Sequence, residues 1–299
     1  MKKIGGLISI SLVVIFWGIS FVSISIMLEV VNPVVLGFLR YVLAVLFVLI
    51  LAFSKRMSFK ITKADFLIFF LAALIGIFLY SSLENTALLF ISSSAGAIFA
   101  SLTPMSTMIG NRLVFKESIR PRNILFIIIS MIGVGLVVAS DLTLELSWWS
   151  ILGYGLMILS IISWTAYNIF TKKVTLKYDS LKVTTIQSII VLFIFLPSLF
   201  IAPPNFTAFE PKHWFHLLFL GIICSGVAYY LYVHSVDTLG LTIPNIFINF
   251  LPVVTIITNA ILFKTQIHFI QVIGGLLIIL TMTLLTLDSV RQTKEKLLT

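Results

Sequence analysis

Long runs of apolar residues, separated by short polar segments, follow one another along the whole chain. Ten of these runs are long enough to cross the hydrocarbon core of a bilayer as a helix, which takes about 20 residues. The predicted spans cover residues 5–28, 33–53, 65–90, 93–114, 122–140, 149–171, 182–202, 213–236, 241–263 and 268–288. The segments between them are too short for a soluble domain. We therefore predict an all-α integral membrane protein with ten transmembrane helices, whose function lies inside the helical bundle.

Positive charges fall in every second predicted loop. Lys and Arg accumulate on the cytoplasmic side of membrane proteins. With the N-terminus placed in the cytoplasm, 17 of the 20 Lys and Arg residues lie on the inner side, Lys212 and Lys264 lie outside, and Arg40 lies within the second span. This split predicts a multi-pass protein of a bacterial-type cell membrane with both termini in the cytoplasm. The net charge of +9 then faces anionic lipid headgroups rather than nucleic acid.

The composition argues against soluble-type enzymology. Hydrophobic residues make up 60% of the 299 residues, and only 10% are charged. The first apolar run resembles a signal peptide, but no small-residue cleavage site and soluble domain follow it, so we interpret it as an uncleaved helix. The single cysteine, Cys224, excludes an intramolecular disulfide. His213 and His216 have a spacing that could hold a metal, but they flank Trp214 at a helix mouth, which favours interfacial packing. We predict no enzyme activity, cofactor or metal site.

The second half of the chain repeats the first at an offset of 147–148 residues. Trp17 pairs with Trp164 at offset 147. At offset 148 the matches continue through a whole helix: Phe99 with Phe247, Pro104 with Pro252, Thr107 with Thr255, Asn111 with Asn259, Phe115 with Phe263 and Lys116 with Lys264. Because each half has five spans, the second half enters the membrane upside down. We predict two inverted five-helix repeats, residues 1–146 and 147–290, followed by a short basic cytoplasmic tail, 291–299.

Short motifs follow a fixed order along both halves. They are Phe16-Trp17-Gly18, Asn32-Pro33, Arg40-Tyr41, the run from Leu83-Glu84-Asn85 through Ser92 to Leu102-Thr103-Pro104, Phe115-Lys116-Glu117, Trp164, Ala228-Tyr229-Tyr230, Pro244, Leu251-Pro252 and Gly274-Gly275. In this order they resemble the drug/metabolite transporter superfamily, EamA family, over nearly the full chain. The family usually has an acidic residue after the ninth span, where this chain has Thr265-Gln266.

The resemblance implies a secondary active transporter that moves small organic metabolites by alternating access, with the solute and the lipid bilayer as its partners. It implies little about the substrate, because the family spans amino acids, sugars, cofactors and other metabolites. Many relatives are exporters, so efflux is our first hypothesis for direction, and import or exchange are the alternatives. A membrane enzyme or a scaffold that transports nothing is a less favoured class. Protons as the coupling ion, and a monomer or homodimer, stay open.

Trp17 and Trp164 share a repeat position and lie near the middle of their predicted spans, away from the headgroup level where Trp usually gathers. We predict two aromatic walls around a central cavity, and packing with local hydrogen bonds is the alternative. Such a cage favours amphipathic, cationic or amino-acid-like solutes through stacking and cation–π contacts. Four tyrosines from three helices are predicted to extend it: Tyr80, Tyr167, Tyr229 and Tyr232.

Arg40 and Glu84 are charged residues that lie well inside predicted spans, at similar depth. Charges within the membrane are costly, so they pair or serve function. Three interpretations remain: a fixed ion pair, a role of Glu84 in binding substrate or a coupling proton, and exposure of Glu84 to outside water. We predict that the two side chains approach each other, directly or through one water. The second half has Gln187 and Tyr232 at the equivalent positions, so this electrostatic feature is one-sided.

Polar and helix-breaking residues mark the fourth and ninth predicted spans. Asn245 and Asn249 share a helix face by their i, i+4 spacing, and we predict that they either contact substrate or hold helices together. Pro104 and Pro252 each free a backbone carbonyl and can kink a helix. They are predicted hinges, or sites of carbonyl groups that line the cavity.

Overall fold

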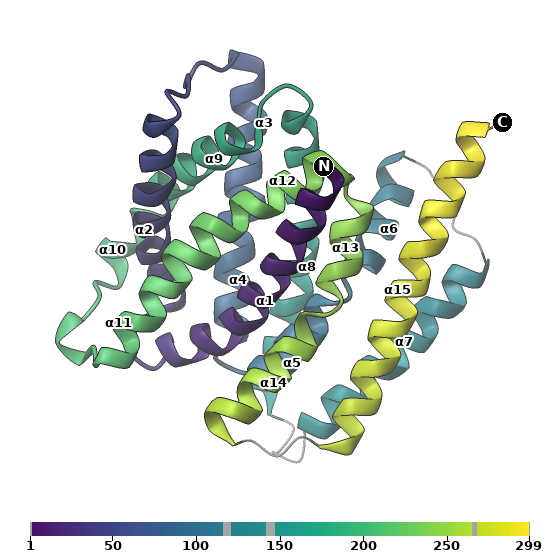
Figure 1. Cartoon of the computed structure of the whole chain (residues 1–299). Coiled ribbons are helices and arrows are strands. Elements are labelled where there is room, and N and C mark those ends of the chain that lie inside the picture. The colour runs from purple at the N-terminus through teal and green to yellow at the C-terminus, as the bar shows by residue number, and fades with distance from the viewer. Residues whose placement is uncertain (1, 116–120, 142–146, 265–267, 299) are drawn as a thin grey trace.

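The described part of the chain consists of helices and loops, without strands (Figure 1). The computed structural model describes residues 2–115, 121–141, 147–264 and 268–298. The predicted loops at 116–120 and 142–146, and Thr265-Gln266, lie outside these residues. The elements are α1 (Lys2–Met27), α2 (Pro33–Ser54), α3 (Lys63–Ala73), η1 (Leu74–Leu79), α4 (Tyr80–Ala87), α5 (Ser93–Ala100), α6 (Thr103–Phe115), α7 (Pro121–Asp141), α8 (Trp148–Thr175), α9 (Ser180–Phe195), α10 (Ser198–Ile201), η2 (Phe206–Ala208), α11 (Pro211–Leu218), η3 (Phe219–Ala228), α12 (Tyr229–Leu239), α13 (Thr242–Ile248), α14 (Leu251–Phe263) and α15 (Phe269–Leu298).

Eight helical stretches of the described residues are long and apolar enough to cross a membrane. They are Lys3–Met27, Pro33–Ser54, Lys63–Ala87, Trp148–Thr175, Ser180–Ile201, Pro211–Leu239, Ile243–Phe263 and Phe269–Asp288. The fourth predicted span is divided between α5 and α6, and the apolar part of α7 is a shorter stretch, Pro121–Val137. A multi-pass helical membrane protein is therefore confirmed, and the count of ten spans stays a prediction. The last helix continues to Leu298, so residues of the predicted tail extend it.

The helices are interrupted at matching places in the two halves. One break lies between Ala100 of α5 and Thr103 of α6, and the other lies 148 residues later, between Ile248 of α13 and Leu251 of α14. Two segments are π-helical, η1 in the first half and η3 in the second, and a shift of 148 residues carries η1 into η3. Single π-helical turns are rare and often occur at functional sites. The two halves thus share helical irregularities as well as sequence motifs.

Pro104 and Pro252 lie directly after the two breaks. Each is the second residue of the helix that follows, α6 or α14. Near the start of a helix the missing N–H of proline has no intrahelical acceptor to lose. These prolines therefore begin a new helix rather than bend a continuous one, and their role as hinges stays a prediction.

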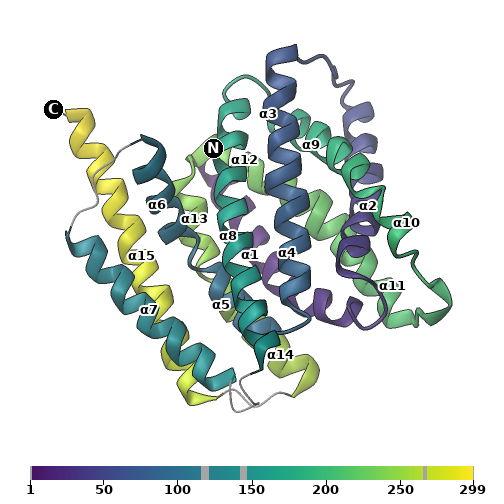
Figure 2. The ribbon, with the colours of Figure 1, turned by 180° about the vertical axis from the view of Figure 1, so that it is seen from behind.

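Helices α7 and α15 form a pair at one edge of the bundle. Figures 1 and 2 show them side by side, with α6 and α13 between them and the remaining helices. Gly133 and Gly274 allow the close approach, since a Cβ on either one would lie 2.8 or 2.7 Å from the carbonyl oxygen of the other. An ion pair between Arg122 and Asp288 also joins the two helices.

The two ends of the bundle differ in which segments they carry. In both views the start of α1, the start of α3 and the end of α15 lie at the upper end, which we call the terminal end. The start of α11 and the loop between α1 and α2 lie toward the lower, opposite end. The depth of each site residue is described below by its position between these two ends.

Candidate functional site

Trp17 and Trp164 lie in contact between the two halves of the chain. Their ring centroids are 5.3 Å apart in an edge-to-face arrangement, a geometry that aromatic pairs prefer. The indole N–H of Trp17 donates to the carbonyl oxygen of Cys224 at 3.2 Å, within the π-helical segment η3. Trp164 is only 4% exposed. The structure thus brings together the two tryptophans that share a position in the repeat.

The four predicted tyrosines surround this pair. Tyr80, Tyr167 and Tyr232 have ring centroids 5.1, 4.8 and 5.1 Å from that of Trp164. Tyr229 and Tyr232 lie 5.3 and 5.2 Å from Trp17. Every ring therefore touches at least one tryptophan. We call the following six residues the aromatic cluster: Trp17, Tyr80, Trp164, Tyr167, Tyr229 and Tyr232.

Little free space remains beside the aromatic cluster. A cavity of about 20 Å³ is lined by Trp17, Tyr80 and Trp164. Residues on both sides of both helix breaks also line it: Ala100, Thr103, Ile248 and Leu251. This volume holds about one water molecule. The rings fill one another's space in this conformation, so they must separate before an organic solute can enter.

On the side toward the terminal end, the cluster meets a neutral hydrogen-bonded network. The Tyr232 hydroxyl donates to Asn168 Oδ1 at 2.6 Å, and the Tyr167 hydroxyl donates to Gln187 Oε1 at 3.3 Å. Gln187 Nε2 donates in turn to Thr171 Oγ1 at 3.1 Å. All five side chains are buried. The amide of Gln187 therefore has both of its ends paired.

On the side toward the opposite end, the buried groups are charged. Arg40 and Glu84 are each 5% exposed. Glu84 accepts a hydrogen bond from the hydroxyl of Tyr80, one turn earlier in its helix, and Arg40 Nε donates to Ser225 Oγ at 3.1 Å. Arg40 Nη1 is buried without a hydrogen-bond partner.

Arg40 and Glu84 form no ion pair with each other among the described residues. The direct contact predicted from their equal depth is therefore wrong for this conformation. Depth along two helices does not fix the direction in which each side chain points, and each residue here has a hydroxyl group as its nearest polar partner. An approach through one water stays a prediction.

At the helix break in the second half lie buried side-chain amides that lack hydrogen-bond partners. Asn249 is fully buried, and neither its amide nitrogen nor its oxygen has a hydrogen-bond partner, while Asn245 has an unpaired Oδ1. At the equivalent break in the first half, the hydroxyls of Ser101 and Thr103 donate to backbone carbonyl groups of their own turn at 2.6 and 2.7 Å. The residues on either side of the second break line the cavity beside the aromatic cluster. The unpaired amides thus lie within a few residues of that cavity.

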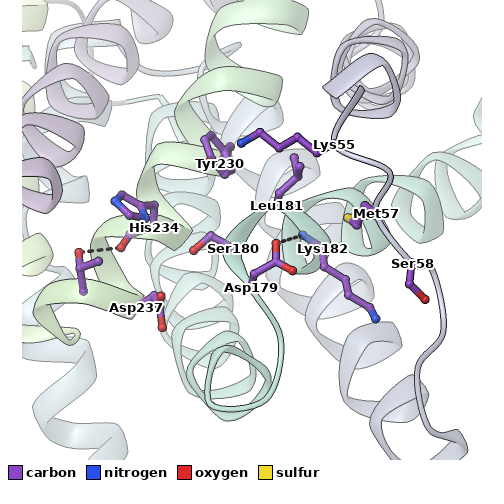
Figure 3. A pocket seen from close by; sticks show the side chains of 11 residues that line it. Lys55, Met57, Ser58, Asp179, Ser180, Leu181, Lys182, Tyr230, His234 and Asp237 are labelled. Atoms are coloured by element: carbon purple, nitrogen blue, oxygen red, sulfur yellow. Dashed lines mark hydrogen bonds between the residues drawn. The ribbon is translucent and has the colours of Figure 1, made fainter. Parts of the chain in front are cut away.

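A larger cavity opens at the terminal end. It has a volume of about 600 Å³ and lies where the end of α2, the start of α9 and helix α12 meet (Figure 3). Its polar lining includes Lys55, Asp179, Lys182, His234 and Asp237. Asp179 accepts a hydrogen bond from the backbone N–H of Lys182 at 3.0 Å and so caps α9. We call this cavity the vestibule.

Helix α12 connects the vestibule with the aromatic cluster. Tyr230 and His234, one turn apart, line the vestibule with their rings stacked at 6.5 Å. Tyr229 and Tyr232 of the same helix belong to the aromatic cluster. The sequence did not predict the vestibule, because its lining comes from three segments far apart in the chain. Its signal in the sequence was the mixture of charges at the end of α2, the start of α9 and the end of α12.

Asp65 joins two segments at the terminal end. This buried carboxylate, at the start of α3, accepts hydrogen bonds from Lys177 Nζ at 2.8 Å, the Tyr178 hydroxyl at 2.8 Å and Thr62 Oγ1 at 2.7 Å. The hydrogen bond to Asp65 raises the pKa of the Lys177 ammonium group above its usual value. These bonds hold the start of α3 to the loop between α8 and α9.

A weaker contact lies at the opposite end. Glu29, in the loop between α1 and α2, has its carboxylate 3.1 Å from Lys212 Nζ and 3.6 Å from His213 Nε2, both at the start of α11. The Glu29 side chain is 52% exposed. Solvent screens such pairs, so this contact contributes little on its own.

Comparisons with known proteins agree with the repeat and with the fold. A sequence model described as the EamA-like transporter family matches residues 4–139 and again residues 151–287, so the two matches begin 147 residues apart. An uncharacterized transporter of Archaeoglobus fulgidus is 26% identical over 271 residues, which cover 90% of this chain and 93% of its own. The uncharacterized transporter YetK of Bacillus subtilis is 23% identical over 281 residues, covering 91% and 84%.

A solved crystal structure has a similar arrangement of helices. Its TM-score with this chain is 0.70, it is 15% identical in sequence, and the match covers 96% of this chain and 98% of that one. At this level of identity, the likeness concerns the fold alone.

Proposed function

The chain belongs to the EamA-like transporter family, and from this membership we propose that it is a secondary transporter that moves small organic metabolites by alternating access. The observation that carries the proposal is the aromatic cluster beside the two matching helix breaks. Discontinuous helices near the bilayer midplane form the substrate sites of many secondary transporters. The two halves of the chain contribute equivalent residues to one site, Trp17 and Trp164.

In this proposal the solute enters between the rings of the aromatic cluster. Trp17 and Trp164 form its walls, and Tyr80, Tyr167, Tyr229 and Tyr232 complete the cage. The unpaired amide groups of Asn245 and Asn249 supply hydrogen bonds that the closed conformation lacks. Buried polar groups without partners are costly, and a bound polar solute offsets that cost.

The two end contacts support alternating access through two inverted five-helix repeats. We place the terminal end in the cytoplasm, because the basic loops lie there. The Asp65 contact then closes the inner side and the Glu29 contact the outer side. We propose export as the direction of transport, with protons as the candidate coupling ion.

Transport by the purified protein in proteoliposomes tests the proposal. We expect accumulation of at least one solute from a panel of amphipathic, cationic and amino-acid-like metabolites, measured with and without a proton gradient. Trp17→Ala and Trp164→Ala should each lower the rate per folded protein by about tenfold or more, whereas Trp214→Ala, at a 45% exposed indole, should not. Chemical conversion of a solute without its translocation would point to an enzyme, and no flux for any solute would point to a scaffold.

Single cysteines test the proposed orientation. In a Cys224→Ser background, Ser58→Cys and Ser147→Cys should react with an impermeant reagent from opposite sides of the membrane. Labelling of both in intact cells contradicts the ten-span topology.

A further inference from the structure

We propose that Arg40 and Glu84 recognise the two charged ends of a zwitterionic substrate, with a carboxylate bound at Arg40 and an ammonium group at Glu84. The inference rests on the proposed function, because the transported solute is the ligand. It replaces the fixed ion pair, which the structure does not form, with two separate binding positions on the side of the aromatic cluster away from the terminal end.

Arg40 carries the first half of the inference. A guanidinium group keeps its charge in proteins, so burial leaves it in need of acceptors. Arg40 Nε has Ser225 Oγ as its acceptor, but Nη1 is buried without any. A buried charge that lacks its partner is strongly destabilising. A carboxylate is the acceptor whose two oxygens match the guanidinium fork. The Glu84 carboxylate lies within the electrostatic reach of Arg40, but no described carboxylate forms an ion pair or hydrogen bond with it.

Glu84 carries the second half. This carboxyl group is buried and accepts a hydrogen bond from the Tyr80 hydroxyl, and no described cationic side chain forms an ion pair with it. A carboxylate accepts several hydrogen bonds, and an ammonium group donates three. An ammonium group at Glu84 also lies near the rings of Tyr80 and Trp164, whose faces attract cations.

Both charges connect directly to the aromatic cluster. Ser225, the partner of Arg40, follows Cys224, whose carbonyl oxygen binds the indole of Trp17. Tyr80, the partner of Glu84, packs against Trp164 at 5.1 Å. A zwitterion with an apolar or aromatic body would place that body between the separated rings and its two charges at Arg40 and Glu84.

At the equivalent positions of the second half, the two residues are neutral and hydrogen-bonded within the protein. Gln187, which corresponds to Arg40, has its amide paired at both ends, and Tyr232, which corresponds to Glu84, donates to Asn168. Those neutral groups have found partners within the protein. Unpaired charge is therefore concentrated on the side of Arg40, and we assign charge recognition to that side alone.

Three probes with one aromatic body and different charges test the inference in proteoliposomes: phenylalanine, phenethylamine and phenylpropionate. The wild type should transport phenylalanine in preference to each of the other two by about tenfold to a hundredfold, the effect of one hydrogen bond to a charged group. Arg40→Gln should abolish the preference over phenethylamine, and Glu84→Gln the preference over phenylpropionate. Because each ratio is taken within one variant, it does not depend on the amount of folded protein.

Two further variants serve as controls. Arg40→Lys keeps the charge but loses the fork, so it should retain part of the preference. Leu46→Ala changes a 55% exposed residue of the same helix and should leave all ratios unchanged. If Arg40→Gln lowers the transport rates of all three probes equally, Arg40 does not recognise the carboxylate, and the proposal is wrong. The proposal is also wrong if the wild type transports other metabolites but does not distinguish these three probes. If no solute tested is transported, the proposed function itself is wrong, and this inference falls with it.

Discussion

The contacts at the two ends of the bundle occupy equivalent positions but place their acidic residue on opposite partners. Asp65 meets Lys177 at the terminal end, and the residues 148 positions away from each, His213 and Glu29, meet at the opposite end. In each pair the residue at the start of a helix is buried, with 3% of its side chain exposed, and the loop residue is exposed, at 61% and 52%. The acidic residue is thus the buried one at the terminal end and the exposed one at the opposite end.

The two contacts also differ in strength. Asp65 accepts three hydrogen bonds of 2.7 to 2.8 Å. His213 Nε2 lies 3.6 Å from Glu29 and has no hydrogen-bond partner, and Glu29 is shared with Lys212. Hydrogen bonds to a buried carboxylate are stronger than a screened surface pair. Equivalent positions of the fold thus hold the terminal end firmly and the opposite end loosely.

The largest expected effect comes from exchanging the charges at the terminal end. Asp65→Lys alone places two positive groups together at a buried position, so we expect loss of most folded protein from the membrane. Adding Lys177→Asp should recover a substantial part, because the opposite end already has its basic residue at the start of the helix and its acidic residue in the loop. The measurement is the yield of monodisperse protein, analysed as a double-mutant cycle. If the double variant shows no recovery of folded protein, the two contacts are not equivalent.

A smaller effect should follow from Asp65→Asn, which keeps the shape and removes the charge. Opening at the terminal end should become more frequent by about tenfold, the effect of losing one hydrogen bond to a charged group. The readout is the labelling rate of Ser180→Cys in the vestibule, in a Cys224→Ser background. An unchanged rate means that this contact does not hold the terminal end closed.

Glu29→Gln is the matched change at the opposite end, and its effect should be smaller. The pair is half-exposed, so we expect less than about a fivefold change in the labelling rate of a cysteine introduced at Val30. An effect larger than that of Asp65→Asn reverses the order of strength inferred from the geometry.

Sequence patterns predicted those features that depend on position along one helix or on the repeat. Apolar runs marked the helices, and the shared offset of Trp17 and Trp164 predicted that they line one cavity. The Asp65 contact was missed, because nothing in the sequence at the start of a helix identifies a partner in a distant loop. The direct contact between Arg40 and Glu84 was predicted wrongly, because depth was known and side-chain direction was not, and their approach through one water stays a prediction. The π-helical segments left no recognisable signal in the sequence.

The tight packing of the aromatic cluster has an electrical consequence. A potential across a membrane is worth about 2.3 kcal/mol per elementary charge for each 100 mV. Beside Trp17 and Trp164 there is room for about one water molecule, too little for a continuous file of water along which protons or ions could pass. Between these two rings the protein thus offers protons and ions no continuous path of water in this conformation, and the potential across the membrane drives no current there.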